Sequence, residues 1–261
     1  MFDMDERPLS LQEMLRRALT SQVELGMGEV ILPPRRATNM ETDLDQQLMM
    51  AATESQRVVA VSDLFGEERP LGPQEPQFAS LDRHFDSVQN CQECPLGATR
   101  NKFVYGAGNP NADLLFIGEA PGADEDRIGE PFVGRAGQLL DKILAAINLS
   151  REEVYITNIL KCRPPGNRDP QPAEMEKCFP LLKEQVALIA PKLICALGRI
   201  AAQALLKTTT PLGKLRGRWH KYEGVPMLVT YHPAALLRFQ SYKKDTWADM
   251  QMLRARYDEL V

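Results

Sequence analysis

Hydrophobic residues beyond position 113 form short apolar runs that alternate with longer segments of helical spacing. The short runs, typical of buried strands, span residues 114–117, 154–158, 193–197 and 227–231. The longer segments predict helices at residues 137–147, 173–189, 200–206 and 242–260, the second interrupted near Pro180. This alternation predicts an α/β fold, a three-layer α/β/α sandwich with a central, mostly parallel, four-stranded sheet.

The first 78 residues lack this periodicity and differ in charge. They hold 7 Lys and Arg against 14 Asp and Glu, whereas residues 79–261 hold 24 against 21. We expect residues 1–78 to be an acidic, proline-containing, disordered extension and residues 79–261 to form the folded domain. A capping-box pattern at residues 10–13 leaves two alternatives open, a helix that docks on a protein partner and a transient helix.

Composition narrows the class of protein. Hydrophobic residues make up 44% of the chain and charged residues 25%, which is ordinary for a soluble protein. No apolar stretch approaches the roughly 18 residues of a membrane span, and residues 1–20 lack an apolar signal-peptide core. We therefore expect a cytoplasmic protein without membrane association, and we expect it to be a monomer. In that compartment the five cysteines are expected to be free or metal-bound.

The first candidate site is the loop after the strand at residues 114–117. It reads Gly118-Glu119-Ala120-Pro121-Gly122 and continues into the acidic run Asp124-Glu125-Asp126. Ligands of open α/β sheets bind outside the carboxyl ends of the strands, and Gly118 and Gly122 would let the backbone pass close to a ligand. The alternative is a solvated acidic loop that caps a helix.

A second candidate group lies near the same sheet edge. His232 follows the fourth strand and can donate a hydrogen bond to an oxygen that gains negative charge, while Leu236 or Leu237 can act as an apolar wedge. Asn158 ends the second strand with an amide that both donates and accepts, and Phe132 offers a flat stacking face. Taken singly, His232 and Phe132 are also explained by structural packing.

Four cysteines form a metal-binding pattern. Cys91 and Cys94 make a CxxC pair, and Cys162 and Cys178 follow far downstream. Four thiols suit zinc or an iron–sulfur cluster, and spacing alone does not choose between them. Prolines after Cys94 and Cys162 favour iron–sulfur. The fifth thiol, Cys195, lies within an apolar strand and is expected to pack in the core.

Together these segments resemble the family 4, or iron–sulfur, uracil-DNA glycosylases. The matching segments are Gly118–Gly122 with Glu125-Asp126, Gly129–Leu140, Thr157–Pro165 with Asn167-Arg168, and His232–Ala235 with Leu237-Arg238. The resemblance covers roughly residues 85–260 and includes the cysteines. It implies a three-layer α/β/α fold, a 4Fe–4S cluster of mainly structural role held by the four cysteines, and removal of uracil from deaminated DNA during base excision repair.

The resemblance also implies residue roles. Phe132 would stack on an extruded uracil, Asn158 would read its polar edge, and His232 would bond the carbonyl oxygen beside the glycosidic nitrogen. Glu125 would exclude the methyl group of thymine.

Glu119 and the backbone of Ala120 would lie beside the sugar and the attacking water. Ala120 stands where better-known uracil glycosylases carry an aspartate, so the sequence names no strong general base. Relatives that trap uracil covalently carry an extra basic segment ending in histidine, which this chain lacks, so we expect turnover.

Basic loop residues are expected to meet the phosphates of uracil-containing DNA, single- or double-stranded. These residues are Arg163, Arg168, Lys214, Arg216, Arg218 and Arg238. An alternative function is a weakly catalytic or non-catalytic iron–sulfur DNA-binding module that recruits a repair or replication partner, but the intact Phe132, Asn158 and His232 argue against lost chemistry. A nucleotide-binding oxidoreductase is disfavoured because Gly106-Ala107-Gly108 opens no complete GxGxxG motif.

Overall fold

The structure is a computed structural model that describes residues 75–260. The predictions for residues 1–74, including the helix at residues 10–19, lie outside the described residues. None of the described helices has both the length and the apolar character needed to cross a membrane.

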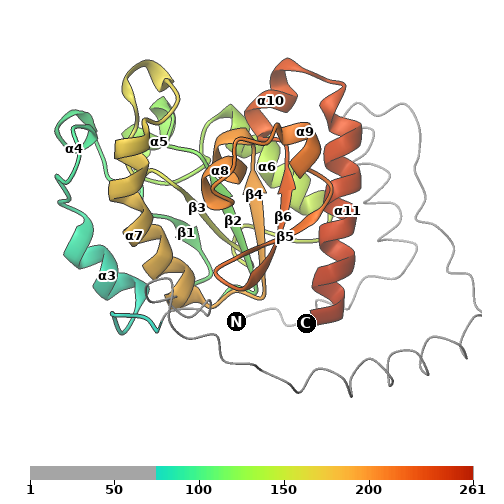
Figure 1. The fold of residues 1–261 in the computed structure, drawn as a ribbon, viewed down its shortest axis with the longest axis horizontal. Helices are drawn as coiled ribbons and strands as arrows, with labels where there is room; N and C mark the ends of the chain where they lie inside the picture. Colours follow the sequence, from blue (N-terminus) through green and yellow to red (C-terminus); the bar gives the residue numbers. More distant parts are fainter. Residues whose placement is uncertain (1–74, 261) are drawn as a thin grey trace, which may run out of the picture. The chain divides into compact units, whose positions relative to one another are not determined.

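A six-stranded sheet of order β1-β3-β2-β4-β6-β5 forms the centre of the described domain (Figure 1). Its strands are β1 (Ala107–Gly108), β2 (Leu114–Gly118), β3 (Tyr155–Asn158), β4 (Leu193–Leu197), β5 (Trp219–Tyr222) and β6 (Val225–Thr230). The predicted strands are the four parallel central ones, and β1 and β5 add antiparallel edges. The prediction of four strands is therefore corrected to six. A two-residue strand and a polar, exposed one leave no apolar run to detect.

Helices cover both faces of the sheet, which confirms the α/β prediction. They are α3 (Leu81–Val88), α4 (Leu96–Thr99), α5 (Ala123–Ile128), α6 (Arg135–Ala146), α7 (Pro172–Ile189), α8 (Arg199–Leu205), α9 (Leu212–Leu215), α10 (Pro233–Arg238) and α11 (Tyr242–Leu260), with a 3₁₀ turn at Pro165–Asn167. Figure 1 shows α7 and α11 on opposite sides of the sheet. The predicted interruption at Pro180 is wrong, because α7 continues through this exposed residue.

Alternating strand residues build two apolar layers, as expected for a sheet covered on both faces. Leu115, Ile117 and Ile194 join the cluster that contains Leu182 of α7 and Ala201 of α8. The intervening residues on these strands are equally buried, and Cys195 is among them at 0% exposure. Cys195 therefore packs in the core, as predicted.

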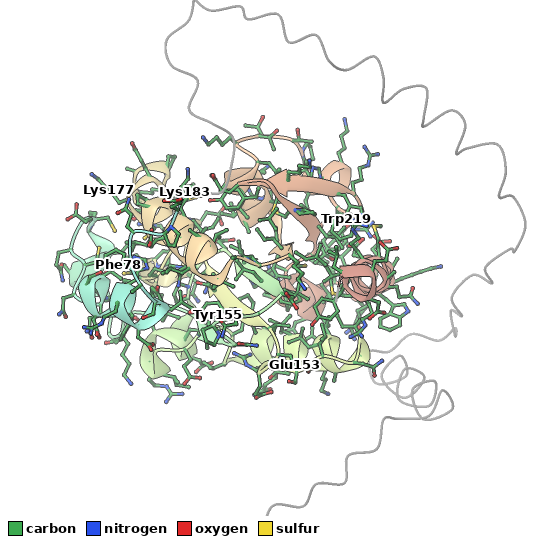
Figure 2. All side chains as sticks on the ribbon, turned by 90° about the horizontal axis from the view of Figure 1, so that it is seen from below. Phe78, Glu153, Tyr155, Lys177, Lys183 and Trp219 are labelled. Atoms are coloured by element: carbon green, nitrogen blue, oxygen red, sulfur yellow. The ribbon has the colours of Figure 1, made fainter. Side chains whose placement is uncertain are left out.

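Contacts with α7 begin just before α3. The backbone N–H groups of Gln77 and Phe78 donate to Oε1 of Glu184 at 2.7 and 2.9 Å, and Ser80 caps α3 by accepting from the N–H of Arg83. Figure 2 shows Phe78 near α3 and α7. The division of the chain at residue 78 stays a prediction, because the residues before 75 are not described.

Candidate active site

The candidate site lies at the carboxyl ends of β2, β3 and β6. From β2 the chain moves to β3 on one side and then crosses to β4 on the other, which makes the end of β2 a topological switch point. Gly118 and Asn158 are register partners at the ends of β2 and β3, and His232 follows β6 by two residues. The three motifs therefore share one edge of the sheet.

Gly118 provides space for two neighbouring side chains. A Cβ atom at this position would lie 2.7 Å from the Phe132 ring and closer still to Oδ1 of Asn158. No larger residue fits without displacing them, so Gly118 lets Phe132 and Asn158 converge. The space next to the Cα atom of Gly118 is therefore filled by these two side chains and is not open to a ligand.

Asn158 presents an unpaired acceptor. Asn158 is 2% exposed, and its Oδ1 atom has no hydrogen-bond partner among the described residues. Leaving a buried polar atom unpaired costs about 1–3 kcal/mol, so such an atom calls for an explanation. A ligand N–H at this position would remove the cost.

A buried lysine, Lys161, binds the backbone at the carboxyl end of β3. Nζ of Lys161, which is 0% exposed, donates to the backbone oxygen of Asn158 at 2.7 Å and to Oε1 of Gln185 at 2.6 Å. Burial lowers the pKa of Lys161 to about 7. Sequence reasoning missed this residue, because a lysine in a loop gives no sign that it turns inward.

His232 is held as a neutral ring with a defined tautomer. Its Nδ1 atom accepts a hydrogen bond from the N–H of Ala234 at 3.1 Å, so Nε2 carries the proton. Burial, with a smaller contribution from the charge of Arg238, lowers the pKa of His232 to about 4. The ring stacks on Phe132 with centroids 5.4 Å apart.

Gly198 makes room for this arrangement and was missed in the sequence. A Cβ atom there would lie 2.8 Å from Cβ of His232, and its φ of +93° is a conformation that favours glycine.

Glu119 follows Gly118, and the pKa of its carboxyl group is raised. Burial, and then the nearby carboxylate of Asp169, raise its pKa to about 7, while Arg199 opposes this shift. Asp169 and Arg199 form an ion pair at 2.7 Å. The neighbouring Ala120 is partly buried and packs against the core. A carboxyl group that changes its charge near neutral pH is suited to acid–base work.

Glu125 binds backbone groups of its own chain. Its Oε1 accepts from the N–H groups of Val133 and Gly134, both at 2.9 Å, and its Oε2 accepts from the N–H of Gly122 at 3.1 Å. Gly122 is the N-cap of α5, and a Cβ atom there would lie 2.7 Å from Oε2. Glu125 therefore links the loop after β2, which contains Gly122, to the loop before α6, which contains Val133 and Gly134.

The predicted DNA-contacting arginines divide into two groups. Arg168 forms a bidentate pair with the buried Glu174, and Arg216 does the same with the buried Asp249. Their charges are compensated within the fold, and their contact with phosphates stays a prediction. Arg163, Arg218 and Arg238 have no ion-pair partner within residues 75–260, and Lys214 is exposed.

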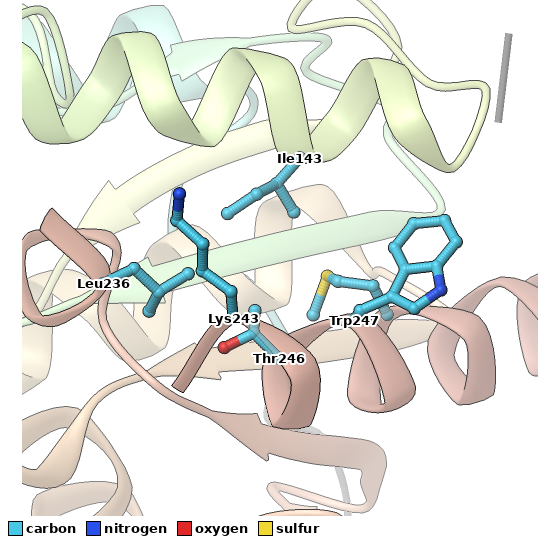
Figure 3. Close-up of a pocket in the computed structure, with 6 residues that line it drawn as sticks. Ile143, Leu236, Lys243, Thr246 and Trp247 are labelled. Atoms are coloured by element: carbon cyan, nitrogen blue, oxygen red, sulfur yellow. The ribbon is translucent and has the colours of Figure 1, made fainter. Parts of the chain in front are cut away.

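Only one of the two candidate wedge residues reaches the surface. Leu236 is 1% exposed and lines a small cavity of about 10 Å³. Figure 3 shows Leu236 with two other lining residues, Ile143 of α6 and Trp247 of α11. Leu237 is 40% exposed and Phe239 is 51% exposed. The expectation for Leu236 is therefore corrected, since this side chain packs in the interior.

The four cysteines of the metal pattern are free thiols that influence one another. Cys162 and Cys178 are buried, and Cys91 and Cys94 are partly exposed. Burial raises the pKa values of the Cys162 and Cys178 thiols; Cys94 adds to both shifts and Cys91 to that of Cys178, so the thiols lie within range of one another's charges. Nη1 of Arg100 donates to Sγ of Cys162 at 3.4 Å.

Four thiols match in number and chemistry the ligands of an iron–sulfur cluster. Their side chains are not gathered into a finished site, because among residues 75–260 no group of three or more His, Cys, Asp or Glu side chains is arranged to hold a metal ion.

Comparisons with known proteins agree with this fold and site. A family model of the uracil DNA glycosylase superfamily matches residues 105–251. The type-4 uracil-DNA glycosylase of Archaeoglobus fulgidus is 43% identical over 182 residues, covering 67% of this chain and 92% of the relative. That of Saccharolobus solfataricus is 46% identical over 167 residues, covering 60% of this chain and 77% of the relative.

The fold and site therefore define an α/β protein of the uracil DNA glycosylase superfamily. Within it, the chain belongs to the type-4 uracil-DNA glycosylase family. The type-5 uracil-DNA glycosylase of Pyrobaculum aerophilum is more distant, with 35% identity over 49% of this chain.

Proposed function

We propose that this protein is a DNA-repair hydrolase that cleaves the N-glycosidic bond of uracil in DNA and leaves an abasic site. The observation that carries the proposal is the buried, unpaired Oδ1 of Asn158 next to the Phe132 ring. Uracil has an N3–H donor that satisfies this atom, whereas N3 of cytosine is an acceptor and leaves it unpaired. An extruded base stacked on Phe132 would be read in this way.

The neutral His232 ring is placed to stabilise the leaving group. Bond cleavage leaves a uracil anion, and Nε2–H of His232 would donate to the carbonyl oxygen on which that charge develops. Because the donor is neutral and fixed by Ala234, no reorganisation is needed as the charge grows. The C–N bond would break ahead of water attack, with nearby carboxylates stabilising the sugar cation.

Glu119 is the residue that we assign to the attacking water. Its carboxyl group has a pKa of about 7, so it is protonated below neutral pH and ionised above it. If the ionised form holds the water, the excision rate rises as pH increases through about 7. We expect Glu119→Gln to flatten this profile between pH 6 and 8 in single-turnover assays. An unchanged profile in the variant would assign the water to another group.

DNA contacts would come from exposed or half-buried residues near this edge of the sheet. Arg163, Arg218 and Arg238 would bind phosphates, and Leu237 would fill the space left by the extruded base. Extrusion costs a few kcal/mol, which stacking and pocket hydrogen bonds offset.

Cys91, Cys94, Cys162 and Cys178 would hold a 4Fe–4S cluster that serves as a structural cross-link. In this role it fastens the segment before β1 to the loop after β3 and to α7, and the fold rather than the reaction depends on it.

We expect the anaerobically purified protein to be brown and to contain about four irons per chain. Cys91→Ala should lower iron content and thermal stability together, because one anchor of the cross-link is lost. Cys195→Ala is the matched control, since this buried thiol lies in β4 and should leave iron content unchanged. Stoichiometric zinc without iron would overturn the assignment.

The proposed function is tested with uracil-containing single-stranded and duplex oligonucleotides. Treatment with alkali after incubation cleaves the strand at an abasic site, so a product of defined length reports excision. Oligonucleotides with cytosine or thymine at the same position should stay intact. DNA binding without excision by the iron-loaded protein would favour the non-catalytic binding module instead.

A further inference from the structure

Phe132 has a backbone conformation that aromatic residues rarely adopt. Its φ is +54°, in the left-handed region, while its side chain is 5% exposed and stacks on His232. Such a conformation persists only where surrounding contacts hold it. The contacts that hold the loop around Phe132 therefore decide where its ring lies.

Arg151 binds the loop on the carbonyl side. Its Nη1 donates to the oxygen of Phe132 at 2.9 Å and its Nη2 donates to the oxygen of Pro131 at 2.7 Å. The guanidinium is itself held by Asp141, which accepts from Nη1 at 2.9 Å. A planar group with fixed donors that binds two consecutive carbonyls restricts rotation of the peptide between them.

Glu125 binds the same loop on the amide side. One carboxylate oxygen accepts from Val133 and Gly134, the two residues that follow Phe132, and the other accepts from Gly122. Opposite charges thus hold the peptide groups before and after Phe132. Gly137 completes the arrangement, because a Cβ atom there would overlap the carbonyl of Phe132.

We propose that Arg151 and Glu125 are positioning residues that clamp the Phe132 loop, so that the ring stands ready to stack on an extruded base. The inference rests on the proposed function for the identity of that base. It also changes the role of Glu125: both carboxylate oxygens are engaged by backbone N–H groups, so the residue shapes the pocket through Phe132 instead of contacting a methyl group.

The position of the ring is measured without any reaction. The full-length protein is labelled with 4-fluorophenylalanine, and the Phe132 signal among the nine phenylalanines is identified by its absence in Phe132→Leu. Arg151→Met should shift or broaden this signal, because the ring leaves the face of His232. Arg254→Met is the matched control, since Arg254 donates to the carbonyls of Ile147 and Asn148 and pairs with Asp258. An unmoved Phe132 signal in Arg151→Met overturns the clamp.

Single-turnover excision of uracil separates positioning from general stability. Arg151→Met should lower the rate by about 10- to 100-fold, the scale expected for a misplaced contact group, and Arg151→Lys should recover part of it. In a Phe132→Ala background the same change should alter the rate less than about twofold, because the clamped ring is already gone. Losses that multiply would mean that Arg151 acts independently of Phe132.

Glu125→Gln separates the clamp from exclusion of thymine. The clamp predicts a lower uracil rate and no release of thymine, since the loop loses its charged acceptor. Normal uracil excision with new thymine release would overturn the clamp in favour of methyl exclusion. An inactive parent protein would refute the proposed function alone, and the fluorine signal would still decide whether Arg151 holds Phe132.

Discussion

Asn158→Asp is expected to lower uracil excision by about 10⁴-fold while DNA affinity stays nearly constant. A site built on hydrogen bonds loses heavily when one partner is left unpaired. The substitution replaces the amide donor with a second acceptor, so the carbonyl of uracil loses its partner. It also places a negative charge beside a base that becomes an anion. Single-turnover rates and equilibrium binding to a uracil-containing duplex measure the two effects separately.

The control for this prediction is Asn111→Asp, which makes the same chemical change at an exposed position before β2. It should leave both rate and affinity unchanged. Normal uracil release by Asn158→Asp would show that the amide donor of Asn158 takes no part in base recognition, which would contradict the proposed reading of uracil by this side chain.

His232→Ala is expected to lower single-turnover excision by about 100- to 1,000-fold, the usual cost of one preorganised oxyanion donor. The donor acts only as the glycosidic bond breaks, so DNA binding should change little. His220→Ala is the matched control, because His220 lies on β5 and contacts the backbone oxygen of Leu215 at 2.9 Å. Excision at the parental rate by His232→Ala would refute the proposed stabilisation of the anion.

The charge state of His232 can be checked by NMR titration of its ring. Its pKa is lowered from 6.5 to about 4, so the ring should stay neutral as pH falls from 7 to 5 and gain a proton only near pH 4. Because the unfolded chain binds this proton near pH 6.5, the neutral ring contributes stability above that pH, and the contribution is lost as pH falls toward 4. A midpoint near 6.5 would contradict the lowered pKa, because a substantial fraction of the imidazole would then be charged at neutral pH.

Strand positions and the main site residues were readable from the sequence for physical reasons. A strand buried on both faces must be continuously apolar, so β2, β3, β4 and β6 appear as runs, and the parallel order follows from the helices between them. Because these strands are parallel, residues at their carboxyl ends lie at the same edge of the sheet. The sequence therefore predicts that Gly118, Asn158 and His232 lie at the same edge of the sheet.

Tertiary structure alone decided which side chains are free to act. Leu236 and Leu237 are adjacent and chemically alike, but the packing of α10 against α6 and α11 buries the first. Likewise, only the tertiary structure shows that Arg216 donates to Asp249, on α11, at 2.6 Å, so that its charge is compensated within the fold.

The roles of Arg151 and Glu125 were also decided by the tertiary structure alone. Their partners are backbone groups of a loop whose path no periodicity reveals, since hydrogen bonds to peptide groups leave no side-chain pattern in the sequence. Local patterns in the sequence determine the helices and strands and the order in which they follow one another. Contacts between segments distant in sequence exist only once the chain has folded, and these contacts set the charge, exposure and orientation of each residue at the site.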